Sequence, residues 1–142
     1  QPGPTGSALL KMLCGCQHRG PDSTGLAIYG PVAGEPLILR VFLAADVCRD
    51  PQAWSERRTR VERVLTQHDF ETISLWQDRD QMRISGAFEG DIQSLSYAIE
   101  VVAGVEIFSA GHSLEILKDE GTAEALDAFV AAKKASMPDS FM

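Results

Sequence analysis

Apolar residues recur every three or four positions in several stretches of the chain, which is the spacing of one face of a helix. This pattern predicts helices over residues 7–18, 50–66, 91–104 and 122–134. Asp50 followed by proline is a typical helix start, as is Asp91, and Gly104 is a typical helix end. We expect Cys16 to be buried in the core, because it belongs to the apolar stripe of the first helix.

Other stretches are continuously apolar or short and rich in β-formers, and these predict strands. The expected strands cover residues 26–29, 36–44, 70–77, 82–88 and 105–110. The second is almost entirely apolar, so it should be buried on both faces. The third and fourth are joined by the polar turn DRDQ and should form a hairpin, whereas SLEILK (residues 113–118) predicts a short helical turn. The order of elements predicts one mixed domain of the α+β class over residues 1–142.

The composition and net charge of the chain disfavour some classes of function. The 142 residues are 44% hydrophobic and 23% charged, which is an ordinary globular mix. A net charge of −7 disfavours nucleic acids and anionic membranes as partners, and no apolar run could cross a bilayer. Three cysteines without a signal peptide predict reduced thiols in the cytoplasm. The start, QPGPTGS, has no initiator methionine, from which we expect the chain to begin partway into a longer protein.

The turn HRGPDSTG (residues 18–25) is the densest group of polar and turn-forming residues. Gly20 permits a sharp exit from the preceding helix, and the proline that follows forces it away from helical dihedrals. Asp22 and Ser23 can bond nearby backbone amides and fix the turn. Arg19 would then stand on a rigid corner, where its planar fork could hold a carboxylate. Alternatively, Arg19 caps the last carbonyls of the helix and pairs with Asp22.

Residues 16–30, CQHRGPDSTGLAIYG, resemble the RGPDS-type turn of the class II glutamine amidotransferases, which include asparagine synthetases and glutamate synthase-type enzymes. Residues 109–121, SAGHSLEILKDEG, resemble a strand–loop segment of the glutamate synthase-like branch. The resemblance implies an N-terminal-nucleophile hydrolase fold with α/β/β/α layers, incomplete in this chain. It also implies glutamine as substrate, no cofactor and no metal. A synthase subunit or domain would receive the ammonia.

The resemblance carries over only a wall of the glutamine pocket, formed by Arg19, Gly20, Asp22 and Ser23. The family's nucleophile is an N-terminal cysteine whose free α-amino group is the base, whereas this chain begins with Gln1. The family's Gly-His-Thr-Arg strand, Asn-Gly oxyanion pair and amine-binding aspartate are also missing. The chain therefore contains no assigned catalytic residue, and we expect no glutaminase activity from it alone. We also expect uncovered strand edges and self-association.

Two other groups of residues could carry chemistry. Cys14 and His18 are four apart on a helix and could form a thiol–imidazole pair, or could be a small hydrophobe and an exposed histidine. A metal site built from these residues and Cys16 is disfavoured, because its ligands would point to different helix faces. Ser113 lies in a Gly-His-Ser-Leu sequence typical of a hydrolase nucleophile elbow. However, Glu115 replaces the second glycine and no histidine follows, so Ser113 could instead cap a turn.

Three functions therefore stay open at the level of sequence. The first is a catalytically incomplete amidotransferase domain, the second a non-catalytic amidotransferase-like subunit or interaction module, and the third a serine hydrolase or acyltransferase using Ser113. The arginines of the second helix alternate with glutamates, which predicts a solvated face rather than a nucleic-acid patch; they are Arg57, Arg58, Arg60 and Arg63. Trp54 and Trp76 should lie in the core or at its edge.

Overall fold

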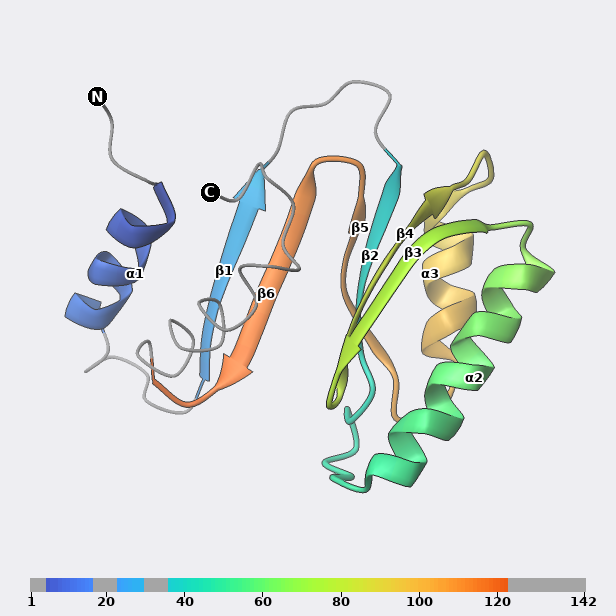
Figure 1. Cartoon of the computed structure of the whole chain (residues 1–142), viewed down its shortest axis with the longest axis horizontal. Coiled ribbons are helices and arrows are strands. Elements are labelled where there is room, and N and C mark those ends of the chain that lie inside the picture. Colours follow the sequence, from blue (N-terminus) through green and yellow to red (C-terminus); the bar gives the residue numbers. More distant parts are fainter. Residues whose placement is uncertain (1–4, 17–22, 30–35, 123–142) are drawn as a thin grey trace. The chain divides into compact units, whose positions relative to one another are not determined.

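The computed structural model describes residues 5–16, 23–29 and 36–122, and the chain divides into two compact units (Figure 1). Unit 1 comprises Gln1–Gly30 and Ile116–Met142, and unit 2 comprises Pro31–Glu115. The described elements of unit 1 are α1 (Thr5–Cys16), β1 (Ser23–Tyr29) and most of β6 (Leu114–Glu120). β1 and β6 form a two-stranded sheet, and Thr24 Oγ1 donates a hydrogen bond of 2.9 Å to the Gly121 carbonyl.

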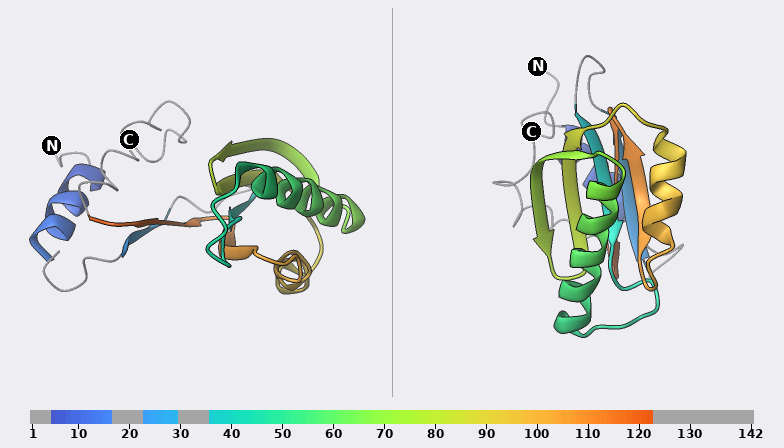
Figure 2. Two further views of the ribbon diagram at one scale, coloured as in Figure 1. Left: turned by 90° about the horizontal axis from the view of Figure 1, so that it is seen from below. Right: turned by 90° about the vertical axis from the view of Figure 1, so that its right-hand side faces the viewer.

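Unit 2 is a four-stranded antiparallel sheet with two helices on one face (Figure 2). Its elements, in chain order, are β2 (Leu37–Phe42), α2 (Pro51–Gln67), β3 (Glu71–Asp78), β4 (Gln81–Ala87), α3 (Ile92–Glu100) and β5 (Glu106–Gly111). The strand order is β3-β4-β2-β5. This β-α-β-β-α-β connectivity is the ferredoxin-like, split βαβ arrangement. The predicted α+β class is confirmed.

The core of unit 2 lies between the sheet and its two helices. Leu37, Leu39 and Val41 alternate along the central strand β2 and are no more than 1% exposed. They join one buried cluster with Val61 and Leu65 of α2. From α3, Leu95 and Ile99 complete it, with Met82 and Ile84 of β4. On the other face of β2, Arg40 is only 5% exposed but Ile38 and Phe42 are half-buried, so the predicted burial of this strand holds fully for one face and in part for the other.

Most of the local signals in the sequence form the structures they predicted. Asp50 begins α2, and its carboxylate accepts a 3.0 Å hydrogen bond from the Gln52 backbone amide. Asp91 caps α3 by accepting from the Ser94 amide at 2.9 Å. β3 and β4 form the predicted hairpin, whereas α3 ends at Glu100, four residues before the predicted end at Gly104, which has φ +76° in the following turn. These elements are fixed by side chains close to them in sequence, which is why the sequence alone could place them.

Two predictions about local structure are wrong. Residues 113–118 do not form a helical turn, because all but Ser113 belong to β6, whose pairing with β1 satisfies backbone groups that so short a helix would leave open. Cys16 is exposed rather than buried, and its neighbour on the apolar stripe, Met12, is 69% exposed. A stripe is buried only where another element packs on it, and here Leu9 and Leu13 are half-buried whereas Met12 and Cys16 are exposed. The helix predicted over 122–134 lies outside the described residues, apart from Thr122.

Arg57 corrects the expectation that the arginines of α2 form a solvated face. Its side chain is 11% exposed and makes a two-pronged ion pair with Asp46, at 2.9 Å and 2.7 Å. It also donates to the Leu43 and Gly104 carbonyls, so one guanidinium joins two loops, β2–α2 and α3–β5, to α2. The hydrogen bonds from Arg57 lower the pKa of the Asp46 carboxyl. The expected solvated pattern does hold for Arg58, which pairs with Glu62 one turn later at 2.9 Å.

Candidate functional site

The turn that carries the family resemblance connects α1 to β1. Arg19, Gly20 and Asp22 lie outside the described residues, and Ser23 is the exposed first residue of β1. The structure therefore gives no geometry for the proposed carboxylate-binding arginine. It does place a helix ending at Cys16 before the turn and a strand after it, which is the order that the sequence predicted.

The candidate nucleophiles are not assembled into a catalytic group among the described residues. Cys14, Cys16 and Cys48 are free thiols, and His18 falls outside the described ranges. Ser113 lies in the turn between β5 and β6, so a strand follows it rather than the helix that a nucleophile elbow requires. In the described part of the chain, no three histidine, cysteine or acidic side chains are grouped to hold a metal ion.

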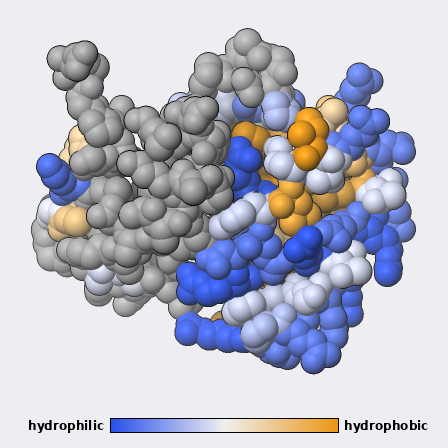
Figure 3. All heavy atoms as spheres, in the orientation of Figure 1, coloured by the Kyte–Doolittle hydropathy of each residue, from blue (hydrophilic) through white to orange (hydrophobic). Residues whose placement is uncertain are grey.

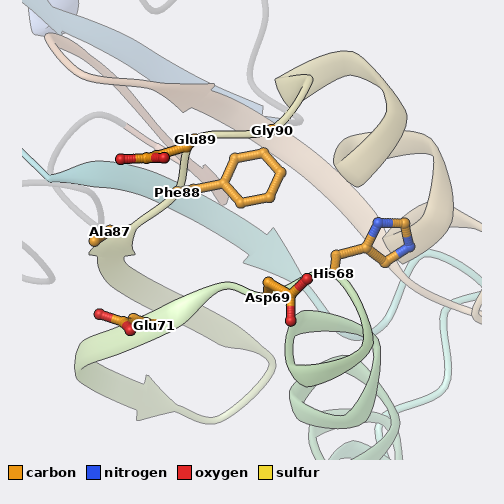
Figure 4. Close-up of a pocket in the computed structure, with 7 residues that line it drawn as sticks. All are labelled: His68, Asp69, Glu71, Ala87, Phe88, Glu89 and Gly90. Carbon is orange, nitrogen blue, oxygen red and sulfur yellow. The ribbon is translucent and has the colours of Figure 1, made fainter.

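A hollow of about 540 Å³ lies in unit 2, beside the start of β3 (Figure 4). Its lining comes from the end of α2 with the start of β3, and from the end of β4 with the loop before α3: His68, Asp69, Glu71, Ala87, Phe88, Glu89 and Gly90. These two segments are far apart in sequence but meet because Glu71 pairs with Ala87 in the β3–β4 ladder. The hollow was not predicted from the sequence.

The end of α2 has the geometry of a Schellman motif. The Phe70 amide donates to the Leu65 carbonyl at 3.0 Å, and the Asp69 amide donates to the Thr66 carbonyl at 3.3 Å. Asp69 has φ +56° in the position that glycine usually occupies. An aspartate at this position destabilises the end of the helix for two reasons. Its Cβ disfavours the left-handed conformation, and its carboxylate lies at the negative end of the helix dipole.

Close packing fixes the floor of the hollow. A Cβ on Gly86 would lie 2.3 Å from the Glu71 carbonyl oxygen and 2.3 Å from the Phe70 ring, so no larger residue fits without movement. The Phe70 and Phe88 rings pack with their centroids 6.1 Å apart. In Figure 4, Phe88 lies between Glu89 and Asp69, and the His68 ring turns away from Glu71. An aromatic ring and carboxylates therefore line the same hollow.

The hollow is acidic. Asp69, Glu71 and Glu89 are exposed, and their carboxylates form no ion pair within the described residues. The only other ionisable side chain in the lining is His68. The sequence signal for this cluster was the pair of segments HDFE and AFEG at the two ends of a predicted hairpin. That signal becomes visible only once the register of β3 against β4 is known.

The two edges of the four-stranded sheet differ. At the β5 edge, the Glu100 carboxylate accepts a 3.2 Å hydrogen bond from the Ile107 amide, so a side chain occupies that edge amide. At the β3 edge, no described strand pairs with the outer side, and the first four residues, Glu71 to Ser74, are exposed. Ile73, at a bulge in β3, is 68% exposed. Figure 3 shows a hydrophobic area over β3 and β4, next to the hydrophilic outer surface of α2.

Comparisons with known proteins identify no family for this chain. No family model and no curated protein matches it. Among solved structures, it is similar to the P2 domain of the chemotaxis kinase CheA from Thermotoga maritima, in a complex with the response regulator CheY. The two share 14% identity with a TM-score of 0.42, over 61% of this chain and 99% of that domain. Across the described ranges, no helix has the length and apolar character needed to cross a membrane.

Proposed function

We propose that this chain is part of a class II glutamine amidotransferase of the glutamate synthase-like kind. The observation that carries the proposal is the sequence CQHRGPDSTGLAIYG at residues 16–30. Its arginine, with Gly20, Asp22 and Ser23, would form one wall of the glutamine pocket. The helix α1 before the turn and the strand β1 after it support the proposal, because both occupy the positions that the resemblance implies.

In the proposed mechanism, the whole protein hydrolyses glutamine to glutamate and ammonia. A cysteine thiolate supplied outside this chain attacks the side-chain amide, ammonia leaves, and water hydrolyses the thioester. Arg19 would line one wall of the glutamine pocket, and the arginine of the family's Gly-His-Thr-Arg strand, supplied outside this chain, would hold the substrate carboxylate and fix the amide in front of the nucleophile. The proposal includes an N-terminal-nucleophile hydrolase fold for the complete domain and a synthase subunit or domain as ammonia acceptor. The three free thiols support a cytoplasmic location.

The gene that encodes this chain tests the proposal. In-frame codons for Met-Cys-Gly upstream of Gln1 and for Gly-His-Thr-Arg downstream of Met142 would support it. Stop codons on both sides would overturn it, because the product would then lack a nucleophile and most of the glutamine pocket. Glutamine turnover by the 142-residue chain itself would also contradict the account, because no assigned nucleophile is present.

The second candidate is a non-catalytic interaction module related to the amidotransferases. Unit 2 favours it, because its described residues form a well-packed ferredoxin-like domain in which no described strand pairs with the outer side of β3. The two candidates differ in one measurement on the whole gene product. The enzyme is labelled at one cysteine by a glutamine analogue carrying a diazoketone, whereas the module is not labelled and still binds its partner.

A further inference from the structure

The open edge of β3 and the acidic hollow at its start form one continuous surface, which we name the β3 surface: Glu71–Asp78 with Asp69, Phe88 and Glu89. We propose that the β3 surface binds an extended, basic segment of a partner protein, which adds a strand to β3 and places an arginine or lysine in the hollow. Only unit 2 carries this inference, so it does not depend on the amidotransferase proposal.

The backbone of β3 provides the first reason. An edge strand directs the N–H and C=O groups of every second residue outward, and an incoming extended chain can pair with them. β3 is eight residues long and contains no proline. Its pairing with β4 is regular from Ser74 to Asp78, beyond the bulge at Ile73. The β5 edge is less suitable, since the Glu100 side chain already occupies the Ile107 amide.

The negative charge of the β3 surface indicates which kind of partner it can bind. The carboxylates of Asp69, Glu71 and Glu89 have no basic side chain paired with them in the described ranges. A cation in the hollow would meet these carboxylates and the face or edge of the Phe88 ring. Guanidinium groups suit such surroundings, because they bond carboxylates in pairs and stack on aromatic rings. An acidic partner would meet only repulsion.

A second copy of this chain is a poorer occupant than a basic segment. Antiparallel pairing of β3 with itself, centred on the strand, would place Glu71 opposite Asp78 of the copy at both ends. Like charges directly opposite each other destabilise a strand pair. The same carboxylates that attract a basic strand therefore discourage self-pairing through this edge.

Asp69 gives the proposal a distinctive signature. The residue occupies a left-handed position where glycine is preferred, at the negative end of the α2 dipole. Asp69→Gly should therefore raise the melting temperature of the protein while weakening the binding of a cationic peptide. A purely structural residue would not produce this opposite pair of effects.

The test uses a fluorescein-labelled octapeptide of alternating valine and arginine, titrated into the whole chain. Its control replaces each valine with proline, which keeps the charge but removes half of the N–H donors. We expect the control to bind at least about tenfold more weakly. We also expect Glu71→Gln and Glu89→Gln each to weaken the binding of the valine–arginine peptide roughly threefold to tenfold. Glu56→Gln, an exposed neutralisation on α2, should leave the binding unchanged.

Amide hydrogen exchange with and without the peptide locates the binding. Protection of the β3 amides, together with the expected variant order, supports the proposal. Equal weakening by Glu56→Gln and Glu71→Gln would show general attraction to a negatively charged protein and would overturn it. Equal binding of both peptides, protection confined to other strands, or β3 protection that grows with protein concentration without any peptide would also overturn it. The last outcome would identify a second copy as the occupant.

Discussion

Units 1 and 2 divide stability and proposed chemistry between them. Unit 2 has a closed apolar core, capped helices and the Arg57–Asp46 ion pair, yet it does not include the turn that resembles an amidotransferase pocket. Unit 1 carries the turn that resembles an amidotransferase pocket, yet the apolar stripe of α1 includes the exposed Met12 and Cys16. The comparison teaches that the best-packed part of a chain need not hold its reactive groups. The predictions below test this difference, beginning with the largest effect.

The core of unit 2 should be far more sensitive to truncation than the apolar stripe of α1. Leu39 is 0% exposed in the central strand, so Leu39→Ala should lower the free energy of unfolding by about 2–5 kcal/mol. Met12→Ala, at a position 69% exposed, should change it by less than about 0.5 kcal/mol. Urea unfolding followed by circular dichroism measures both. Equal losses would show that α1 is packed in solution as tightly as the core.

Arg57 should matter more than any neighbouring arginine of α2. Arg57→Met removes the ion pair with Asp46 and leaves the Leu43 and Gly104 carbonyls without this donor. We expect a loss of about 1–3 kcal/mol in the free energy of unfolding, mainly from the two carbonyls left without this donor. Arg60→Met is the matched control, because Arg60 is exposed on the same helix, and it should change stability by less than about 0.5 kcal/mol. Similar effects of the two substitutions would contradict the role assigned to Arg57.

The start of α2 should depend on the capping oxygen of Asp50. Asp50→Ala removes the acceptor for the Gln52 amide and should lower the free energy of unfolding by about 1 kcal/mol. Asp50→Ser keeps an acceptor and should recover most of that loss. Thermal unfolding of the two variants beside the wild type separates the effects. If serine were no better than alanine, the cap would not be the cause.

Acid should weaken unit 2 through two carboxyls whose pKa values lie below the ordinary value of 3.8. Hydrogen bonds from Arg57 lower the pKa of Asp46, and hydrogen bonds from Ser94 lower that of Asp91. Because folding depresses both pKa values, their stabilisation is complete well above pH 3.8 and is lost as the pH falls through the folded-state values. The free energy of unfolding should therefore fall below about pH 4.

Replacing Asp46 and Asp91 with asparagine isolates the effect of their titration on the free energy of unfolding. An asparagine side chain can still cap the start of α3, so the double variant, Asp46→Asn with Asp91→Asn, mainly removes the titration. Its free energy of unfolding should fall less between about pH 6 and about pH 3 than that of the wild type. The wild type and the double variant should be measured at the same ionic strength, because salt screens the charges in both. An unchanged slope would mean that other carboxyls cause the acid sensitivity.

The sequence predicted most of unit 2 because its signals are local. Asp50 and Asp91 fix the starts of helices through atoms only a few residues away, and continuous apolar residues mark the buried strand β2. The segment that was predicted as a helical turn but forms part of β6 shows the limit of local sequence signals. Six residues with both apolar and charged positions fit either structure, and the pairing with β1, about 90 residues earlier, decides between them.

The two candidate sites were predictable to different degrees. The turn at Arg19 is contiguous in sequence, so its residue types could be recognised at once. The acidic hollow is formed by Asp69 and Glu71 with Glu89, which meet only through the register of β3 against β4. Arg57 was missed for a similar reason, because its partners, Asp46 and the Leu43 and Gly104 carbonyls, lie in loops far from it in sequence.

The most direct test of the central claim is ammonia release from glutamine by the complete product of the natural gene. The wild-type product should release ammonia, and Arg19→Ala should reduce kcat/KM at least about tenfold by removing a charged side chain from the wall of the glutamine pocket. Arg60→Lys, a conservative change at an exposed position of unit 2, should leave turnover unchanged. A complete product that releases no ammonia, or an Arg19→Ala variant as active as the wild type, would contradict the assignment of glutamine chemistry to unit 1.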